Sequence, residues 1–404
     1  MTPGQTVAVA LSGGVDSAVT AALLKAEGHT VFGLTMRLGP TSAQAVRDAR
    51  RVADHLAIAH HVLDLEDAFQ SAVVQPFADA YASGETPLPC AVCNRTIKFG
   101  ALLDHARALG ASLLATGHYV RCLPGPRGPE VHRAVDLSRD QSYFLFALPR
   151  DVLGIVRFPL GTMPSKTETR ARARALGIPV DEKPDSQDLC FAPGGGHTDI
   201  VRRLRPEADQ SGPIVDLEGR VLGQHRGLIH HTVGQRRGLG VGGTEEPLYV
   251  VRLEAEGQRV VVGPRAALAV TTFPVDGLNW LGDDPTLPAE GLPVRVKIRN
   301  AAPRSAARVT PGPSPATAWG GRVTPRAGAA FGRRGEGLGN RAREAGGGPF
   351  WGRKVRETGL LGLAAGAMSS ARRERASRAA GLTVTPGVLP RPTRAGSGRA
   401  EGPA

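Results

Sequence analysis

The chain has 404 residues with 41% hydrophobic side chains, enough for two or three domains, and its 4 cysteines are too few for a disulfide scaffold. No apolar run approaches the roughly 20 residues that cross a membrane, and the start MTPGQTVAVALSGG resembles no secretory signal, so we expect a cytoplasmic protein without a membrane partner. The net charge of +13 arises entirely from residues 301–404, with 18 basic and 5 acidic side chains, so overall charge does not identify a nucleic-acid-binding protein.

The first predicted element is a strand, loop and helix in VAVALSGGVDSAVTAALL, residues 7–24. Val7–Leu11 is short and apolar, which is typical of a buried strand, and an apolar helical face follows the loop. Glycines, serine hydroxyls and the N–H groups of a helix N-terminus favour a phosphate cradle. Asp16-Ser17 stands where a Walker A loop needs Lys-Ser/Thr. A tight turn without a ligand is the alternative.

The next elements alternate between strand and helix patterns. We predict strands at 30–38, 60–65 and 112–117, and helices at about 42–58, 67–81 and 94–109. This alternation predicts an α/β fold, a doubly wound parallel sheet with helices on both faces. Ligands bind such sheets at the carboxyl ends of the strands, where the loop, Met36 and residues 116–118 lie.

From Ala192 the composition shifts to glycine, proline and short apolar runs, which predicts small, mostly-β domains. GLPVRVKIRN is the last segment that alternates clearly like a strand. We divide the chain into 1–195, 196–265, 266–310 and an Arg/Gly/Ala-rich tail at 311–404. The tail is interpreted either as a disordered, RNA-attracting arm or as the product of a lost reading frame.

The cysteines supply the second chemical signal. Cys90 and Cys93 have C-x-x-C spacing, and a helix beginning at about Asn94 would place Cys93 at its N-terminus, where a thiolate is stabilised. Cys190 lies among polar turn residues in KPDSQDLCFAPGGGH and is expected to be exposed. Cys122 has no motif around it and suits a small buried residue.

Together these segments resemble the bacterial tRNA-specific 2-thiouridylases, members of the PP-loop ATP pyrophosphatase superfamily with an adenine nucleotide alpha hydrolase-like sheet. The matching segments are spread over Val7 to about Asn300. They are ALSGGVDS, GLTMRL, PCAVCNRTIKFG, ATGHYVR, SRDQSYFL, FPLGTMPSKTETRARARALGIPV, KPDSQDLCF, GQHRGLIHHTVGQRRGLGV and EPLYVVRL.

The resemblance implies roles for individual residues. Cys93 matches the catalytic nucleophile and Cys190 the cysteine that carries a persulfide. The implied ATP site consists of Ala10, Leu11, Ser12, Gly13, Gly14, Val15, Asp16, Ser17, Met36 and Gly117. The implied contacts with the target base and tRNA are Leu88, Pro89, Cys90, Arg139, Asp140, Gln141, Arg299 and Asn300. Many members have an aspartate, a proposed general acid/base, where this chain has Cys90, and Asn300 replaces the usual aromatic residue.

The implied reaction is ATP-dependent 2-thiolation of the wobble uridine in the anticodon loop of tRNA. ATP adenylates the uracil oxygen, and the loop with Mg²⁺ stabilises the pyrophosphate. A sulfur-carrier protein or cysteine desulfurase supplies the persulfide on Cys190. Either Cys93 attacks the persulfide and releases hydrosulfide, or the persulfide sulfur attacks carbon 2 and Cys93 frees the product.

Three alternatives remain at this point. Cys90, Cys93 and Cys190 could hold an iron–sulfur cluster in a tRNA thiolase. A PP-loop ligase acting on a small molecule explains neither the paired cysteines nor GQRRGLG. A non-catalytic RNA-binding protein would use the basic tail. The resemblance also implies a C-terminal β-barrel, which we expect to be incomplete because strand alternation ends near Asn300.

Overall fold

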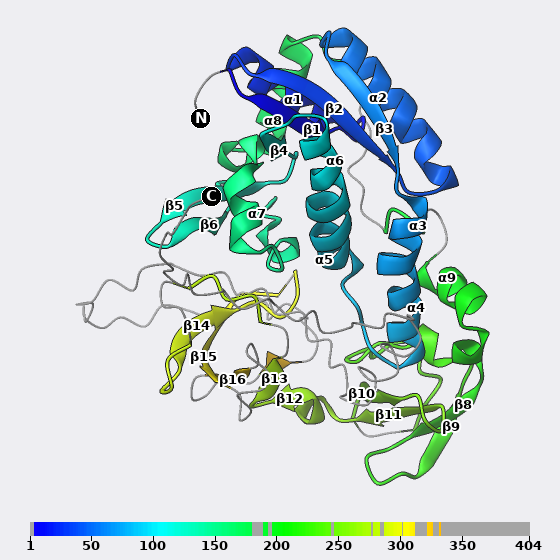
Figure 1. Ribbon diagram of the computed structural model, residues 1–404. Helices are drawn as coiled ribbons and strands as arrows, with labels where there is room; N and C mark the ends of the chain where they lie inside the picture. Colours follow the sequence, from blue (N-terminus) through cyan, green and yellow to red (C-terminus); the bar gives the residue numbers. More distant parts are fainter. Residues whose placement is uncertain are drawn as a thin grey trace, which may run out of the picture. The chain divides into compact units, whose positions relative to one another are not determined.

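The N-terminal half of the computed structural model is built around a five-stranded parallel sheet (Figure 1). Its order is β3-β2-β1-β4-β7, from β1 (Thr6–Ala10), β2 (Thr30–Arg37), β3 (Ala59–Asp64), β4 (Leu113–Ala115) and β7 (Val156–Arg157). Because β2 and β4 flank β1 on opposite sides, the loop after β1 lies where the strand order reverses. The structure describes residues 4–179, 189–192, 196–243, 246–275, 278–282, 287–300, 302–311, 321–325 and 331–332.

Alternate side chains of the sheet enter two apolar layers, which confirms the predicted doubly wound fold. Val7 and Val9 pack in one layer with residues of α1, α2 and α8, whereas Ala8 packs in the other with residues of α6. All three side chains are fully buried. Strands buried on both faces read as continuous apolar runs, and for this reason their sequences were informative.

The helices follow the predicted alternation but are broken into more pieces. The α-helices are α1 (Val15–Ala26), α2 (Ala43–His55), α3 (Glu66–Phe69), α4 (Gln75–Ala82), α5 (Pro89–Cys93), α6 (Leu102–Ala108), α7 (Arg150–Ile155), α8 (Lys166–Ala175) and α9 (His197–Leu204). The 3₁₀ turns are η1 (Pro40–Ser42), η4 (Ser142–Phe144), η5 (Pro159–Thr162), η6 (Pro206–Asp209), η7 (Leu228–His230) and η8 (Arg265–Leu268). Two π-helical segments, η2 (Gln70–Val74) and η3 (Asn94–Ala101), join α-helices. In the described residues, no helix combines the length and apolarity of a membrane span.

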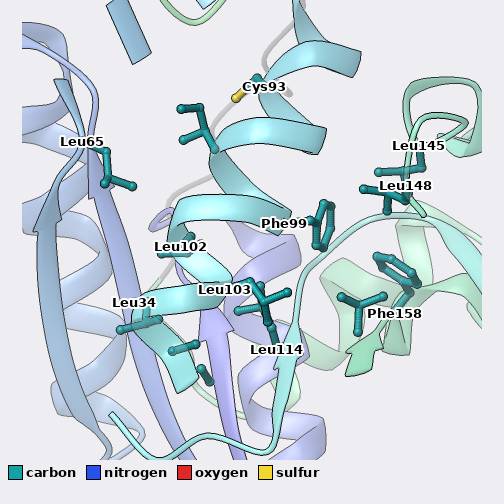
Figure 2. Close-up of a cluster of buried hydrophobic side chains, with 14 of the residues drawn as sticks. Leu34, Leu65, Cys93, Phe99, Leu102, Leu103, Leu114, Leu145, Leu148 and Phe158 are labelled. Carbon is teal, nitrogen blue, oxygen red and sulfur yellow. The ribbon is translucent and has the colours of Figure 1, made fainter. Parts of the chain in front are cut away.

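The cysteine helix, defined as the uninterrupted run α5-η3-α6 from Pro89 to Ala108, corrects one prediction. We expected the helix to begin at about Asn94, but it begins at Pro89, a residue suited to the first helical position. Cys93 is therefore the fifth helical residue and lies inside the helix. Figure 2 shows its sulfur at one end of a buried apolar cluster. The other labelled members of that cluster are Leu34, Leu65, Phe99, Leu102, Leu103, Leu114, Leu145, Leu148 and Phe158.

The remaining strands are short. A hairpin joins β5 (Val120–Gly125) to β6 (Gly128–Arg133). A second sheet, in the order β10-β11-β8-β9, contains β8 (Gly212–Val215), β9 (Val221–His225), β10 (Tyr249–Glu254) and β11 (Arg259–Gly263). Two of the short apolar runs after Ala192, LYVVRL and RVVVG, form β10 and β11, which pair antiparallel.

Two more strand groups follow. A third sheet, in the order β13-β16-β15-β14, contains β13 (Phe273–Val275), β14 (Leu292–Val296), β15 (Ser305–Pro311) and β16 (Gly321–Pro325). A short pair contains β12 (Ala269–Val270) and β17 (Phe331–Gly332). Our expectation that strands end near Asn300 was therefore wrong. The described strands do not close into a barrel, and most of the predicted tail lies outside the described residues.

Candidate functional site

The loop between β1 and α1 combines a tight backbone with an open face. Gly13 has a φ of +74°, and a Cβ there would lie 2.5 Å from the Asp48 Cβ. Gly14 is the N-cap residue of α1 and has only the Ser12 hydroxyl near its missing Cβ, at 3.6 Å. Within the described residues no side chain caps α1, so its first N–H groups face the loop without intrahelical acceptors. Gly13 is thus required by packing, and the open position is Gly14.

Hydrogen bonds fix the shape of this loop. The Ser17 hydroxyl donates to the Gly14 carbonyl at 3.0 Å and accepts from the Ser12 backbone N–H at 3.1 Å. The two serine hydroxyls lie 3.2 Å apart. Leu11 is fully buried, and its backbone N–H donates to the Leu34 carbonyl at 2.8 Å. The loop is therefore organised by its own side chains, which suits a preformed anion site.

Asp16 takes part in a polar network that the sequence did not reveal. Its two carboxylate oxygens accept from the Lys166 ammonium at 2.7 and 2.6 Å, and Oδ1 also accepts from the Tyr119 hydroxyl at 3.0 Å. The Tyr119 hydroxyl lies 2.8 Å from the Thr169 hydroxyl. Lys166 and Thr169 belong to α8, so the network ties the loop to a helix far away in sequence.

The other implied ATP residues lie around the same end of the sheet. Gly117 follows β4, and a Cβ there would lie 2.8 Å from the Asp16 carbonyl carbon and 2.9 Å from the Ser17 nitrogen. The strand end consequently packs directly against the first turn of α1. Met36 is partly buried near the end of β2. Ala10 ends β1, and the side chain of Val15 packs against the apolar layer that contains α1.

Cys93 and Cys190 are brought together by the fold. Cys93 is 7% exposed, whereas Cys90 and Cys190 are exposed, and all four cysteines of the chain are free thiols. Burial raises the pKa of Cys93 to about 11; Lys98 opposes the rise, and charge on Cys190 and Cys90 adds to it. Loss of hydration also raises the pKa of Cys190, and the charge of Cys90 adds to this rise. The three thiols are thus close enough to influence one another electrostatically.

An aromatic anchor holds the residue after Cys190. The Phe191 ring packs edge-on against Phe69 at 5.7 Å and Phe77 at 5.2 Å between ring centroids. Both partners belong to helices that follow β3 in the chain, α3 and α4. Cys190 is exposed, as predicted, while its neighbour is fixed. Most of the polar turn before it, and the glycines at 194 and 195, lie outside the described residues.

The iron–sulfur alternative gains no support from the placement of the thiols. Across the described ranges, no group of three or more His, Cys, Asp or Glu side chains is positioned to hold a metal ion, and Cys90, Cys93 and Cys190 all fall within those ranges. Asp16, the acidic residue of the loop, directs both oxygens to Lys166. The described residues therefore contain no group of three or more such side chains that is placed to bind Mg²⁺.

The predicted tRNA segment 139–141 is partly internal. Asp140 is buried, and its carboxylate accepts from the Arg133 guanidinium at 2.8 Å and from the Ser142 hydroxyl at 2.9 Å. Gln141 is bonded to Tyr119 through its backbone N–H and its side-chain oxygen, both at 2.9 Å. Arg139 is exposed. Asp140 and Gln141 therefore shape the loop that presents Arg139.

The second predicted tRNA segment lies next to the first. The Tyr143 hydroxyl donates to the Ile298 carbonyl at 3.0 Å, and the Lys297 ammonium lies 5.7 Å from the Tyr143 ring centroid. The positive charge of Arg299 lowers the pKa of Tyr143, although burial raises it overall. Asn300 is exposed, and its side-chain oxygen accepts from Lys297 at 3.4 Å. Contacts of Tyr143 thus join the segment 139–143 to the segment 297–300.

The residues that face the predicted target base lie at the start of the cysteine helix. Leu88 precedes the helix, Pro89 is buried as its first residue, and Cys90 is exposed as its second. Cys90 is therefore nearer than Cys93 to the helix N-terminus, which reverses our expectation about which thiol gains from the helix dipole.

Lys166 was the main residue that sequence reasoning missed. Ser165 caps α8 by accepting from the Glu168 backbone N–H at 3.1 Å, a capping box that was visible in SKTE. The capping box places Lys166 at the first helical position, where a cation opposes the helix dipole. That conflict could have indicated a specific carboxylate partner, because a lysine rarely gains from this position alone.

The parallel sheet, the loop at its switch point and the neighbouring thiols define a nucleotide-binding protein of the PP-loop class. The profile described as tRNA methyl transferase HUP domain matches residues 5–194, and the profile described as tRNA methyl transferase PRC-barrel domain matches residues 199–264.

Curated relatives give the finer assignment. The tRNA-specific 2-thiouridylase MnmA of Rhodospirillum rubrum is 56% identical over 321 residues, 76% of this chain and 85% of that protein. The protein of the same name from Methylobacterium radiotolerans is 53% identical, covering 76% and 83%. The solved U34-tRNA thiolase NcsA from Methanococcus maripaludis, with its 4Fe–4S cluster, is 17% identical over 50% of this chain and 66% of that chain, with a TM-score of 0.33. The chain belongs to the tRNA-specific 2-thiouridylase family.

Proposed function

We propose that this chain is a tRNA-uridine 2-sulfurtransferase that consumes ATP to place sulfur on carbon 2 of the wobble uridine, U34. The observation that carries the proposal is the meeting of Cys93 and Cys190 beside the sheet that bears the phosphate-type loop. High identity to relatives named tRNA-specific 2-thiouridylase supports it.

The loop prepares the base for substitution. Uracil O2 attacks the α-phosphate of ATP and expels pyrophosphate, so that the oxygen can later leave as part of AMP. The N–H groups at the start of α1 are suited to stabilise the pyrophosphate charge. Lys166 holds Asp16 and thereby fixes the first turn of that helix. A magnesium ion bound with ATP would neutralise phosphate charge in the same place.

The two cysteines then deliver sulfur. In one route, the Cys93 thiolate attacks Sγ of the Cys190 persulfide, which forms a Cys93–Cys190 disulfide and releases hydrosulfide to attack carbon 2. In the other route, the terminal persulfide sulfur attacks carbon 2 and expels AMP, and Cys93 then attacks Cys190 Sγ to free the thiolated base. Both routes end in the same disulfide, which an external thiol reductant must reduce with two electrons.

We assign tRNA to the joined segments 139–143 and 297–300, which carry the basic residues Arg139, Lys297 and Arg299, with the target base directed to Leu88, Pro89 and Cys90. An anticodon loop suits this site because its bases leave their stack at low cost. The persulfide on Cys190 comes from a sulfur-carrier protein or a cysteine desulfurase, and the reaction takes place in the cytoplasm. We retain 1–195, 196–265, 266–310 and 311–404 as the proposed divisions of the chain.

The decisive experiment separates adenylation from sulfur transfer. Purified Cys93→Ser, Cys190→Ser and control Cys122→Ser proteins are given tRNA, ATP and a persulfide donor. Pyrophosphate release reports adenylation, and mercury-containing gels report thiolated tRNA. We expect the first two variants to retain adenylation and lose thiolation, while Cys122→Ser retains both. Normal thiolation by Cys190→Ser would contradict the persulfide assignment.

A further inference from the structure

The π-helical segment η3 begins immediately after Cys93 and changes which side chains share its face. Residues five apart in an α-helix point about 140° away from one another. A π-helix forms hydrogen bonds from residue i to i+5, so residues five apart come onto the same side. Lys98 is five residues after Cys93 and lies within η3. The unusual helix therefore turns Lys98 toward the face that carries Cys93.

The charges around Lys98 agree with this placement. Lys98 lowers the pKa of Cys93, Cys90 and Cys190, in each case against a larger rise caused by loss of hydration. Among the described residues, it is the cation that acts on all three thiols. In the same ranges, its ammonium has no hydrogen bond or ion pair with another side chain. The charge is thus available to the thiol cluster.

A histidine within the electrostatic reach of Lys98 cannot replace it as a cation. The neighbouring Phe99 ring lies 6.0 Å from His118 and 6.0 Å from Phe158 between centroids. His118 Nδ1 lies 2.6 Å from the Thr116 hydroxyl. Burial, and then the charge of Lys98, hold the pKa of His118 well below its usual value. His118 is therefore neutral at physiological pH and supplies no positive charge to the thiols.

The cluster needs such a charge for sulfur transfer. A thiol whose pKa is about 11, as for Cys93, is thiolate in only about one molecule in ten thousand at pH 7. When one thiolate or persulfide anion forms, its charge makes ionisation of a neighbouring thiol less favourable. A cation shared by the three sulfur positions offsets that repulsion, whichever sulfur carries the charge.

We propose that Lys98 is a positioning residue that stabilises negative charge as it passes among Cys90, Cys93 and Cys190, and that η3 exists to aim it at them. The inference rests on the proposed function for its purpose. Its physical content, a cation that promotes thiolate formation, can be tested without tRNA or ATP.

The test measures alkylation of the full-length protein by iodoacetamide between pH 6 and 10, with each cysteine peptide quantified by mass spectrometry. Lys98→Gln and Lys98→Met should slow alkylation of the exposed Cys90 and Cys190 about tenfold at pH 7.5, which corresponds to a pKa shift of about one unit. Lys98→Arg should restore most of the rate. Arg95→Gln removes a charge from the same π-helical segment, on an exposed side chain, and should leave the rates unchanged.

Unchanged alkylation profiles in Lys98→Gln and Lys98→Met would overturn the proposal, as would an equal effect of Arg95→Gln, which would show a general charge effect. Two substitutions at Lys98 guard against one that merely loosens the helix. Because the assay uses no tRNA, failure of the sulfurtransferase proposal has a different signature: wild-type protein would fail to thiolate tRNA while the dependence of alkylation on Lys98 remained.

Discussion

Because Asp16 and Lys166 form an ion pair but differ in burial, substituting one should reduce local stability more than substituting the other. The Lys166 side chain is 8% exposed and that of Asp16 is 33% exposed. Asp16→Asn takes this carboxylate away from a deeply buried ammonium, for which we expect a loss of about 3 kcal/mol. Lys166→Met leaves a carboxylate that water partly solvates and Tyr119 still contacts, for which we expect about 1–2 kcal/mol. The less buried partner is therefore the more important one to keep.

Hydrogen exchange of the β1 and α1 backbone amides measures these costs locally, which avoids assuming a two-state transition for the whole chain. The double variant should cost at least about 1 kcal/mol less than the sum of the single variants, because both charges are then gone. Glu168→Gln removes the exposed Glu168–Arg172 pair on α8 and serves as the matched control, with an expected change within about 0.5 kcal/mol. An equal or larger cost for Lys166→Met, or simple additivity, would refute the reasoning.

Three further outcomes are expected. Gly117→Ala should weaken ATP-dependent pyrophosphate release more than tRNA binding, since its Cβ would displace the first turn of α1; equal loss of both would contradict this. Burial lowers the pKa of His231 to about 4, so the second sheet should be fully stable above about pH 6.5 and lose roughly 2 kcal/mol by pH 5 as the unfolded state takes up the proton; hydrogen exchange should show a smaller loss in His231→Gln. Cys90→Asp should retain substantial single-turnover thiolation, and loss as complete as in Cys93→Ser would make Cys90 a required sulfur ligand.

The sheet was predictable because its signals are local. Strands β1 and β2 are buried on both faces, so their sequences are mostly apolar; β2 falls within its predicted range, and β1 begins at Thr6, one residue before the predicted start. The loop between β1 and α1 was recognisable from SGGVDS, since Gly13 has a φ of +74°, a backbone conformation that favours glycine. In both cases the physical cause lies within the segment itself.

The strands beyond Asn300 were missed because their pattern is obscured by composition. In β15, Ala307 and Val309 are buried, whereas Arg308 between them is exposed. This alternation is regular, but alanine and arginine carry little strand signal compared with β-branched and aromatic residues. Pairing supplies the missing specificity, since Val309 lies opposite the fully buried Val323 of β16.

The network around Asp16 could not be derived from spacing, because its partners come from two distant segments. Tyr119 follows β4, and Lys166 and Thr169 lie on α8. The only local trace was the conflict between the charge of Lys166 and the dipole of its helix. Such conflicts are a useful guide to tertiary partners, since a buried cation persists only where a specific acceptor compensates it.

The C-x-x-C motif shows why a correct motif can be assigned the wrong physical cause. Its spacing led us to place Cys93 at a helix N-terminus, where the dipole would favour a thiolate. With the helix starting at Pro89, the dipole instead acts most strongly on Cys90, because its effect fades within the first turn. Cys93 lies beyond that turn, and burial raises its pKa to about 11. Activation of the proposed nucleophile must then come from another charge, and in our proposal Lys98, which the π-helical segment turns toward Cys93, supplies it.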